Sequence, residues 1–422
     1  MDRRRSTSTP TPVLAHRALA GIALPLFGIA LLLASAATPA AAVPPLQALA
    51  GEAVGADQGV YAVAADGTLL ASMNAHRAVH PASVTKIAST LALLARLGPD
   101  HRFETRVDAK HEIVDGTLEG DLILTAGGDP FFVFESAFFI LAELRERGLR
   151  RVSGSLVVEG PLIFNWQPDP SGRRLERALA GHDGTGAWTA AQAARPQLAG
   201  LARAEARLAF GAGSTLGDAG ERRELIVYRS PKLVTMLKAF NGYSNNVFEL
   251  LSAAIGGASE VGRFARERVG VELAAEITID NAAGAGRTNR LSPRATVALI
   301  DALAAEASTH GLDLTDLLPV AGIDAGTLED RYRKDDLRGA LVGKTGTYGS
   351  LGASALAGIV RTRRYGDVRF AVLNKDLTVA VARARQDAFL DGLVAAAGGV
   401  ETLAYTPASA APISGAVAES AR

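Results

Sequence analysis

The stretch Pro81-Ala82-Ser83-Val84-Thr85-Lys86 opens an apolar run, Ile87 to Leu97, whose spacing has the period of a helix. Serine is favourable at the N-cap of a helix, so we expect Ser83 to stand at the start of this one. Lys86 follows one turn later and should lie on the same helix face as Ser83. The stretch therefore predicts a hydroxyl and an amine side by side at a helix N-terminus.

Two further strings follow along the chain. Ser244-Asn245-Asn246 comes after a helical pattern over Leu233 to Ala239. Lys344-Thr345-Gly346-Thr347 has the pattern of an edge strand, with neighbouring strands expected over Leu351 to Val360 and Val368 to Asn374. Each string alone is weak evidence for a site, because short motifs recur by accident. The ordered set Ser-x-x-Lys, Ser-x-Asn and Lys-Thr-Gly points to a single site.

The basic residues of the chain are mostly arginine. Of 44 Lys and Arg residues only seven are lysines, and two of these, Lys86 and Lys344, fall inside the strings. A guanidinium stays protonated in proteins, whereas a lysine ammonium can lose its proton when it is desolvated beside another cation. The use of lysine at these two positions therefore favours a role for the amine in proton transfer or catalysis over a role as a charge on the surface.

The N-terminus has the pattern of a secretory signal peptide. Arg3, Arg4, Arg5 and Arg17 precede an apolar run from residue 18 to residue 37, and Ala40-Ala41-Ala42 follows as a small-residue cleavage site. We expect cleavage near residues 42 and 43, export and no stable membrane anchor afterwards. An uncleaved anchor is the alternative, because the run is nearly long enough to span a bilayer.

Length and composition limit the remaining possibilities. A chain of 422 residues is long enough for two domains, and 48% hydrophobic residues with 21% charged residues is a globular composition. The formal net charge of zero gives no indication of nucleic-acid binding. Because the chain has no cysteine, disulfides, thiol nucleophiles and Cys-based zinc sites are excluded. We expect neither a cofactor nor a metal.

The pattern of expected elements indicates an α/β (α+β) protein. Residues 43–100 and 226–400 should form one discontinuous domain, which begins with a hairpin around Ala65-Asp66-Gly67. Residues 101–225 read as an inserted α+β subdomain. Residues 401–422 are rich in Ala, Ser and Pro, and we expect them to be disordered.

The three strings supply the groups that acyl transfer needs. Ser83 is the candidate nucleophile, and Lys86 would accept its proton if the nearby Lys344 lowers the pKa of Lys86. Ser244 could pass that proton to the leaving amine. The backbone N–H groups of Ser83 and Thr347 would form the oxyanion hole.

The other residues of the strings suit substrate binding. Asn246 could hydrogen-bond a substrate amide and hold the lysine base. Lys344 with the hydroxyls of Thr345 and Thr347 suits a terminal carboxylate. Gly346 would let a substrate backbone approach the strand closely.

With these motifs the chain resembles the class C low-molecular-weight penicillin-binding proteins, the D-alanyl-D-alanine carboxypeptidase/endopeptidase family. The likeness covers most of the mature chain and extends to strings outside the three motifs: residues 74–86, 120–122, 127–130, 230–233, 289–294, 318–324 and 354–358. The resemblance implies a penicillin-binding-protein or serine β-lactamase-like transpeptidase domain with an insertion between the first two motifs. It also implies peptidoglycan stem peptides as substrates and β-lactams as covalent inhibitors.

Two features depart from that family. The spacing from Ser83 to Ser244 is shorter than the usual insertion, so one inserted subdomain is expected to be reduced. Asn281-Ala282-Ala283-Gly284 stands where the family usually has Asp-Gly-Ser-Gly, in a loop that borders the site of relatives. Substrate preference is therefore open, as are carboxypeptidase against endopeptidase activity and the oligomeric state.

Other functions are compatible with part of this pattern. A serine β-lactamase shares the three motifs, but no Glu-x-x-Leu-Asn string lies between Ser244 and Lys344. A non-catalytic binder of cell-wall peptides would not need the nucleophile and both lysines. A Ser-His-Asp hydrolase lacks a Gly-x-Ser-x-Gly elbow, and a zinc peptidase lacks His-Glu-x-x-His.

Overall fold

The computed structural model describes residues 46–211, 221–243, 246–332, 336–407 and 412–420. The predicted signal peptide over residues 1–42 lies outside these ranges. Among the helices of the described residues, none combines the length and the apolar character needed to cross a bilayer.

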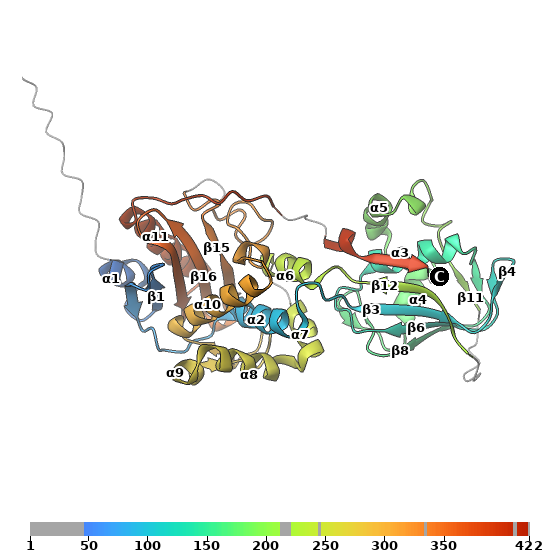
Figure 1. Ribbon diagram of the computed structural model, residues 1–422, viewed down its shortest axis with the longest axis horizontal. Helices are drawn as coiled ribbons and strands as arrows, with labels where there is room; N and C mark the ends of the chain where they lie inside the picture. The colour runs from blue at the N-terminus through green and yellow to red at the C-terminus, as the bar shows by residue number, and fades with distance from the viewer. Residues whose placement is uncertain (1–45, 212–220, 244–245, 333–335, 408–411, 421–422) are drawn as a thin grey trace, which may run out of the picture. The chain divides into compact units, whose positions relative to one another are not determined.

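A five-stranded antiparallel sheet in the order β15-β16-β17-β1-β2 forms the centre of the region that carries the three strings (Figure 1). Its strands are β1 Gly59–Val63, β2 Leu69–Met73, β15 Leu341–Tyr348, β16 Ala353–Thr362 and β17 Gly366–Asn374. The predicted hairpin and the three C-terminal strands are confirmed, and β15 is an edge strand as predicted.

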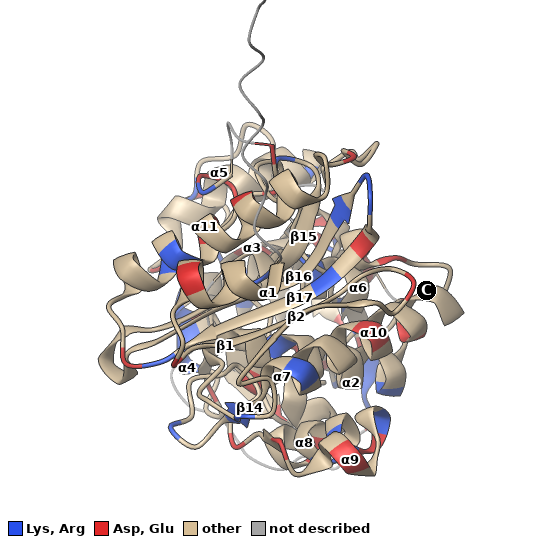
Figure 2. Ribbon diagram, turned by 90° about the vertical axis from the view of Figure 1, so that its left-hand side faces the viewer, with Lys and Arg blue, Asp and Glu red and all other residues tan. Residues whose placement is uncertain are grey.

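Both faces of this sheet are covered, because successive side chains of a strand point to opposite faces. Leu356 and Phe370 belong to a buried cluster with Phe389 of α11 (Val379–Ala396). Ala357 and Ala371 belong to the larger core, which includes α2 (Lys86–Leu97) and α10 (Pro293–Thr309). Figure 2 shows acidic and basic positions interspersed over the visible side of the molecule, in keeping with a net charge of zero.

Helices and short strands complete this region. Ser292 is the N-cap of α10, since its side chain accepts a hydrogen bond from Ala295 N at 3.0 Å. The remaining elements are α1 Leu46–Leu49, the π-helix η1 Ala50–Val54, the 3₁₀ helix η2 Ala82–Thr85, α6 Leu233–Gly242, α7 Val247–Ser252, η4 Ala253–Ile255, α8 Gly257–Val269, α9 Val271–Ala274, β13 Ile277–Thr278, β14 Arg290–Leu291, η5 Leu314–Asp316 and η6 Gly349–Leu351.

A second five-stranded sheet in the order β18-β12-β3-β6-β8 forms the centre of the inserted region. Its strands are β3 Glu104–Ala109, β6 Leu122–Ala126, β8 Leu156–Glu159, β12 Arg223–Arg229 and β18 Val417–Ser420. The other elements of the region are β4 Ile113–Val114, β5 Thr117–Leu118, α3 Phe134–Glu146, β7 Arg151–Val152, β9 Ile163–Phe164, β10 Gln167–Pro168, α4 Arg173–Leu179, α5 Thr185–Ala194, η3 Pro196–Leu198 and β11 Ala209–Phe210.

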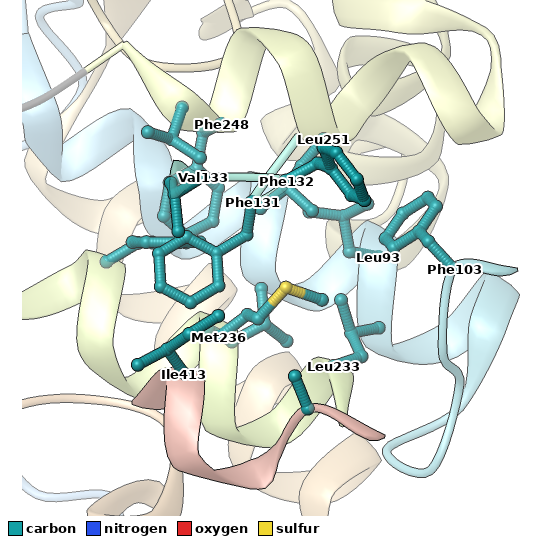
Figure 3. Close-up of a cluster of buried hydrophobic side chains, with 14 of the residues drawn as sticks. Leu93, Phe103, Phe131, Phe132, Val133, Leu233, Met236, Phe248, Leu251 and Ile413 are labelled. Carbon is teal, nitrogen blue, oxygen red and sulfur yellow. The ribbon is translucent and has the colours of Figure 1, made fainter. Parts of the chain in front are cut away.

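The prediction that residues 401–422 are disordered is wrong for the strand β18, which pairs antiparallel with β12. Ile413 of η7 (Pro412–Gly415) is buried, and Figure 3 shows it beside Met236 of α6. Small apolar residues were taken for a disordered composition, although Ala416 and Ala418 are buried. The strand β12 also crosses the predicted domain boundary after residue 225, so that boundary stays a proposal.

Ser83 stands at the start of a helical segment, as predicted, but it is not the N-cap of that segment or of α2. Ser83 lies inside η2, and the residue before α2 is Thr85, whose side chain makes no cap hydrogen bond. The chain enters η2 through Ala82, whose φ of 47° is in the left-handed region. Residues other than glycine rarely adopt this conformation, so the turn before Ser83 has a special backbone geometry.

Candidate active site

A cavity of about 300 Å³ opens where η2, β15 and the segment 280–289 meet. We call residues 81–86 the Ser83 turn and residues 280–289 the cavity loop. The cavity is lined by Ser83, Asn246, Ala283, Gly284, Ala285, Thr347 and Tyr348. Each of the three predicted strings therefore contributes a residue to one cavity.

The hydroxyl of Ser83 lies next to the amine of Lys86. Lys86 Nζ is 3.5 Å from Ser83 Oγ, and Ser83 Oγ donates to Ala283 O at 3.4 Å. Both distances are long, but catalytic hydrogen bonds are often long before a substrate binds. Ser83 is 7% exposed and reaches the cavity, so a substrate carbonyl could approach its oxygen.

Burial sets the protonation of Lys86. The residue has no exposed surface, its Nζ donates to Tyr243 O at 3.4 Å, and it lies 5.6 Å from the centre of the Phe248 ring. Burial lowers the pKa of Lys86 to about 8, because the charged form loses its hydration. A substantial fraction of this amine is therefore neutral near physiological pH and able to accept a proton.

Lys344 is the second buried amine of the site. It is 1% exposed, and its Nζ donates to Thr345 O at 3.1 Å. Burial, and after it the positive charge of Lys86, lowers the pKa of Lys344 well below its ordinary value. We predicted that Lys344 would lower the pKa of Lys86, but burial accounts for the shift of Lys86.

The side chains that follow Lys344 alternate along β15. Thr345 is 6% exposed, and its Oγ1 lies 2.6 Å from Thr327 Oγ1. Thr347 lines the cavity, and Arg383 Nη2 donates to its Oγ1 at 3.5 Å. A Cβ on Gly346 would overlap Pro81 O, so glycine lets the Ser83 turn pack directly on the strand. The structure thus gives Gly346 a packing role in addition to the predicted role toward substrate.

The second string is described only in part. Ser244 and Asn245 lie outside the described residues, so the predicted role of Ser244 stays a prediction. Asn246 is exposed and lines the cavity. Within the described residues no hydrogen bond joins Asn246 to Lys86, whose backbone partner is Tyr243 O.

The cavity loop is held by residues that the sequence reasoning did not single out as site residues. Asn289 is fully buried, accepts from the backbone N–H groups of Asp280 and Asn281, and donates to Thr85 Oγ1 at 3.1 Å. Glu249 Oε2 accepts from Ala282 N at 2.7 Å. Asn289 belongs to residues 289–294, one of the strings that carry the family resemblance. Nothing in that string indicates that Asn289 lies beside Thr85.

Asn281 stands at the first position of the departure from Asp-Gly-Ser-Gly. Its Oδ1 accepts from Ala283 N at 3.0 Å and from Ala285 N at 2.8 Å. An aspartate oxygen could accept the same two bonds, so this substitution preserves the turn. The departure therefore changes side chains at the cavity without removing the loop's internal support.

A sequence profile of the D-Ala-D-Ala carboxypeptidase 3 (S13) family matches residues 46–166 and 213–396, which is more than half of the chain. The chain belongs to the S13 family. The matched ranges contain all three strings. The predicted resemblance to penicillin-binding D-Ala-D-Ala carboxypeptidases and the predicted enzyme class are confirmed at this level.

Curated relatives agree with the S13 assignment. Carboxypeptidase DacB of Mycolicibacterium smegmatis is 28% identical over 379 residues, which cover 82% of this chain and 80% of that protein. D-alanyl-D-alanine carboxypeptidase DacB of Haemophilus influenzae is 30% identical over 91 residues, which cover 22% of this chain and 19% of that relative. S13 membership supports a peptidoglycan peptidase and fits an extracytoplasmic location.

Solved structures share the fold. The penicillin G-acylated predatory endopeptidase Bd3459 of Bdellovibrio bacteriovorus has a TM-score of 0.70 and 22% identity, covering 84% of this chain and 96% of that one. Penicillin-binding protein 4 of Haemophilus influenzae has a TM-score of 0.59 and 17% identity, covering 82% of this chain and 98% of that one. The predicted fold class, a penicillin-binding-protein-like α+β protein, is thereby confirmed.

Proposed function

We propose that this S13 protein is a serine D-Ala-D-Ala peptidase that cleaves peptidoglycan stem peptides through an acyl-enzyme on Ser83. The observation that carries the proposal is the buried amine of Lys86, 3.5 Å from Ser83 Oγ, with its pKa lowered to about 8. A neutral amine in this position can take the proton of the hydroxyl as the oxygen attacks.

The reaction then has two halves. In acylation, Ser83 Oγ forms a bond to the carbonyl carbon of the penultimate D-Ala, its proton passes to Lys86, and the bond to the leaving amine breaks. Ser244 is the candidate to return that proton to the leaving nitrogen. In deacylation, water attacks the ester and releases the shortened peptide with regeneration of the Ser83 hydroxyl.

The negative charge that develops on the substrate carbonyl oxygen needs hydrogen-bond donors to stabilise it. The backbone N–H groups of Ser83 and Thr347 are proposed for this role, because both residues line the cavity. The left-handed conformation of Ala82 sets the direction of the Ser83 peptide, and Gly346 and Gly284 leave room for it.

The substrate carboxylate is proposed to bind beside Thr345 and Thr347. Lys344 is enclosed and bonded to Thr345 O, whereas Arg383 is exposed and donates to the Thr347 hydroxyl at 3.5 Å. Asn246, the residue before α7, also lines the cavity and is proposed to bind the amide of the stem peptide.

We further propose that residues 1–42 direct export and are removed, and that the mature protein acts in the periplasm. The composition of the segment supports this, since four arginines precede an apolar run and a small-residue site. β-Lactams are proposed as covalent inhibitors, because they present an acylating carbonyl to the same serine.

The test is covalent labelling of the purified protein with a fluorescent penicillin, beside Ser83→Ala, read by gel and intact mass. We expect a stable adduct on the wild type only, together with release of D-Ala from a stem pentapeptide. Rapid penicillin hydrolysis without an adduct would identify a β-lactamase. Neither adduct nor hydrolysis would identify a non-catalytic binder.

A further inference from the structure

His80 immediately precedes the Ser83 turn in the chain and is 8% exposed. Its Nδ1 accepts a hydrogen bond from Ala82 N at 3.1 Å. Because Nδ1 accepts, the neutral ring carries its proton on Nε2, which donates to Gly286 O at 2.7 Å. The ring therefore joins the Ser83 turn to the cavity loop by two hydrogen bonds.

His80 also touches the third element of the cavity. Its ring meets that of Tyr348 edge-on, with centroids 5.1 Å apart and planes at 71°. Tyr348 ends β15 and lines the cavity. A single side chain thus contacts three of the four segments that line the cavity, and Asn246 belongs to the fourth.

The bond from Ala82 is the contact that bears on Ser83. A φ of 47° at an alanine is unfavourable and persists only where the surroundings determine it. Gly284 and Gly346 make room for the turn, because a Cβ on either residue would overlap backbone atoms of residues 81–82. The Nδ1 of His80 adds a directed bond to the N–H of the strained residue itself.

We propose that His80 is a positioning residue for acylation, whose Nδ1 holds the left-handed Ala82 peptide so that Ser83 presents its Oγ and its backbone N–H to the substrate carbonyl. The inference rests on the proposed function and deepens it. His80 contacts no reacting atom and acts through the backbone of Ala82.

The role requires a neutral ring, since a proton on Nδ1 would remove the acceptor. Burial is the largest influence on the pKa of His80 and lowers it. The charge of Arg290 acts in the same direction, whereas the bond to Gly286 O and the charge of Asp280 act in the opposite one. The net direction favours the neutral ring.

Two conservative substitutions separate the two hydrogen bonds of the ring. In His80→Asn the amide oxygen can take the place of Nδ1 and accept from Ala82 N, while the bond to Gly286 is lost. In His80→Gln the longer amide can reach Gly286 O, but Ala82 N loses its acceptor. Both variants keep a polar amide, and the glutamine side chain is close to histidine in volume, which guards against a loss of folding.

The experiment measures the acylation rate constant and the preceding dissociation constant separately, using a fluorescent penicillin in rapid-mixing assays. We expect His80→Gln and His80→Ala to slow acylation roughly ten- to hundredfold, with the dissociation constant changed by less than about threefold. His80→Asn should acylate within about threefold of the wild-type rate.

Equal rates in the wild type and His80→Gln would overturn the inference, and so would a His80→Asn variant as slow as His80→Gln. In both cases the proposed function would stand, because the wild type would still be acylated. A wild type that forms no adduct would instead contradict the proposed function itself.

Discussion

The inner and outer sides of the cavity differ in how their residues are supported. On the inner side, the Ser83 turn, Lys344 and Asn289 of the cavity loop are buried, and Asn289 joins the loop to the turn through its hydrogen bond to Thr85. On the outer side, Asn246 and Arg383 are exposed, and the contact of Arg383 with Thr347 is 3.5 Å. The inner side fixes the reacting groups in place, whereas the outer side leaves its groups free to adapt to a ligand.

The largest effect is expected on the inner side, at the proton acceptor. Lys86→Met removes the amine with little change in shape, and Lys86→Arg keeps a cation that cannot accept a proton. We expect each to slow acylation by fluorescent penicillin roughly a thousandfold. Lys232→Arg, at an exposed lysine paired with Asp100, is the matched control and should be neutral. A fully active Lys86→Arg would show that no lysine proton acceptor is needed.

The pH dependence tests the same group in the unmodified protein. In the proposed mechanism the neutral amine is the reactive form, and burial lowers the pKa of Lys86 from 10.5 to about 8. Acylation should therefore rise about tenfold per pH unit below that value and level off above it. The measurement is the second-order acylation rate constant from about pH 6 to about pH 10. A profile that is flat over this range would contradict the proposed role of Lys86.

A paired substitution compares the two sides directly. Asn289→Ala leaves the backbone N–H groups of Asp280 and Asn281 without their acceptor, so unfolding free energy should fall by about 1–3 kcal/mol. Asn246→Ala, at an exposed position, should change it by less than about 0.5 kcal/mol but slow acylation roughly tenfold. Urea unfolding and penicillin acylation measure the two quantities. Equal losses of stability would contradict the distinction between the two sides.

The smallest effect is expected at Arg383. Arg383→Gln should raise KM roughly three- to tenfold for a stem peptide with a free terminal carboxylate, since it removes an exposed charge. The same peptide with a C-terminal amide should show no change. Arg363→Gln, in the turn after β16, serves as the control. A KM effect of equal size on both peptides would rule out carboxylate recognition by Arg383.

The elements with strong periodicity were predictable from the sequence. The apolar runs of β16 and β17 predicted the boundaries of these two strands to within a few residues. The three strings likewise predicted one cavity, because their chemistry is local to each motif. The ranges that match the S13 family include the same residues.

Other features depend on contacts that no local pattern encodes. Asn289 is separated from Thr85 by 204 residues of chain, and its burial follows from the fold alone. The left-handed conformation of Ala82 has no signal in its side chain, since glycine is the usual residue there. The tail was misjudged because its strand covers a distant sheet edge rather than forming a hairpin with its neighbours.

The strand β18 also has a consequence for biosynthesis. It follows the entire catalytic sheet in the chain, yet it covers the edge of β12, which is made much earlier. During synthesis that edge remains open, and an open edge can pair with another chain. Chains truncated near residue 400, or chains with a bulky fusion beside β18, should therefore aggregate even though every motif residue is intact.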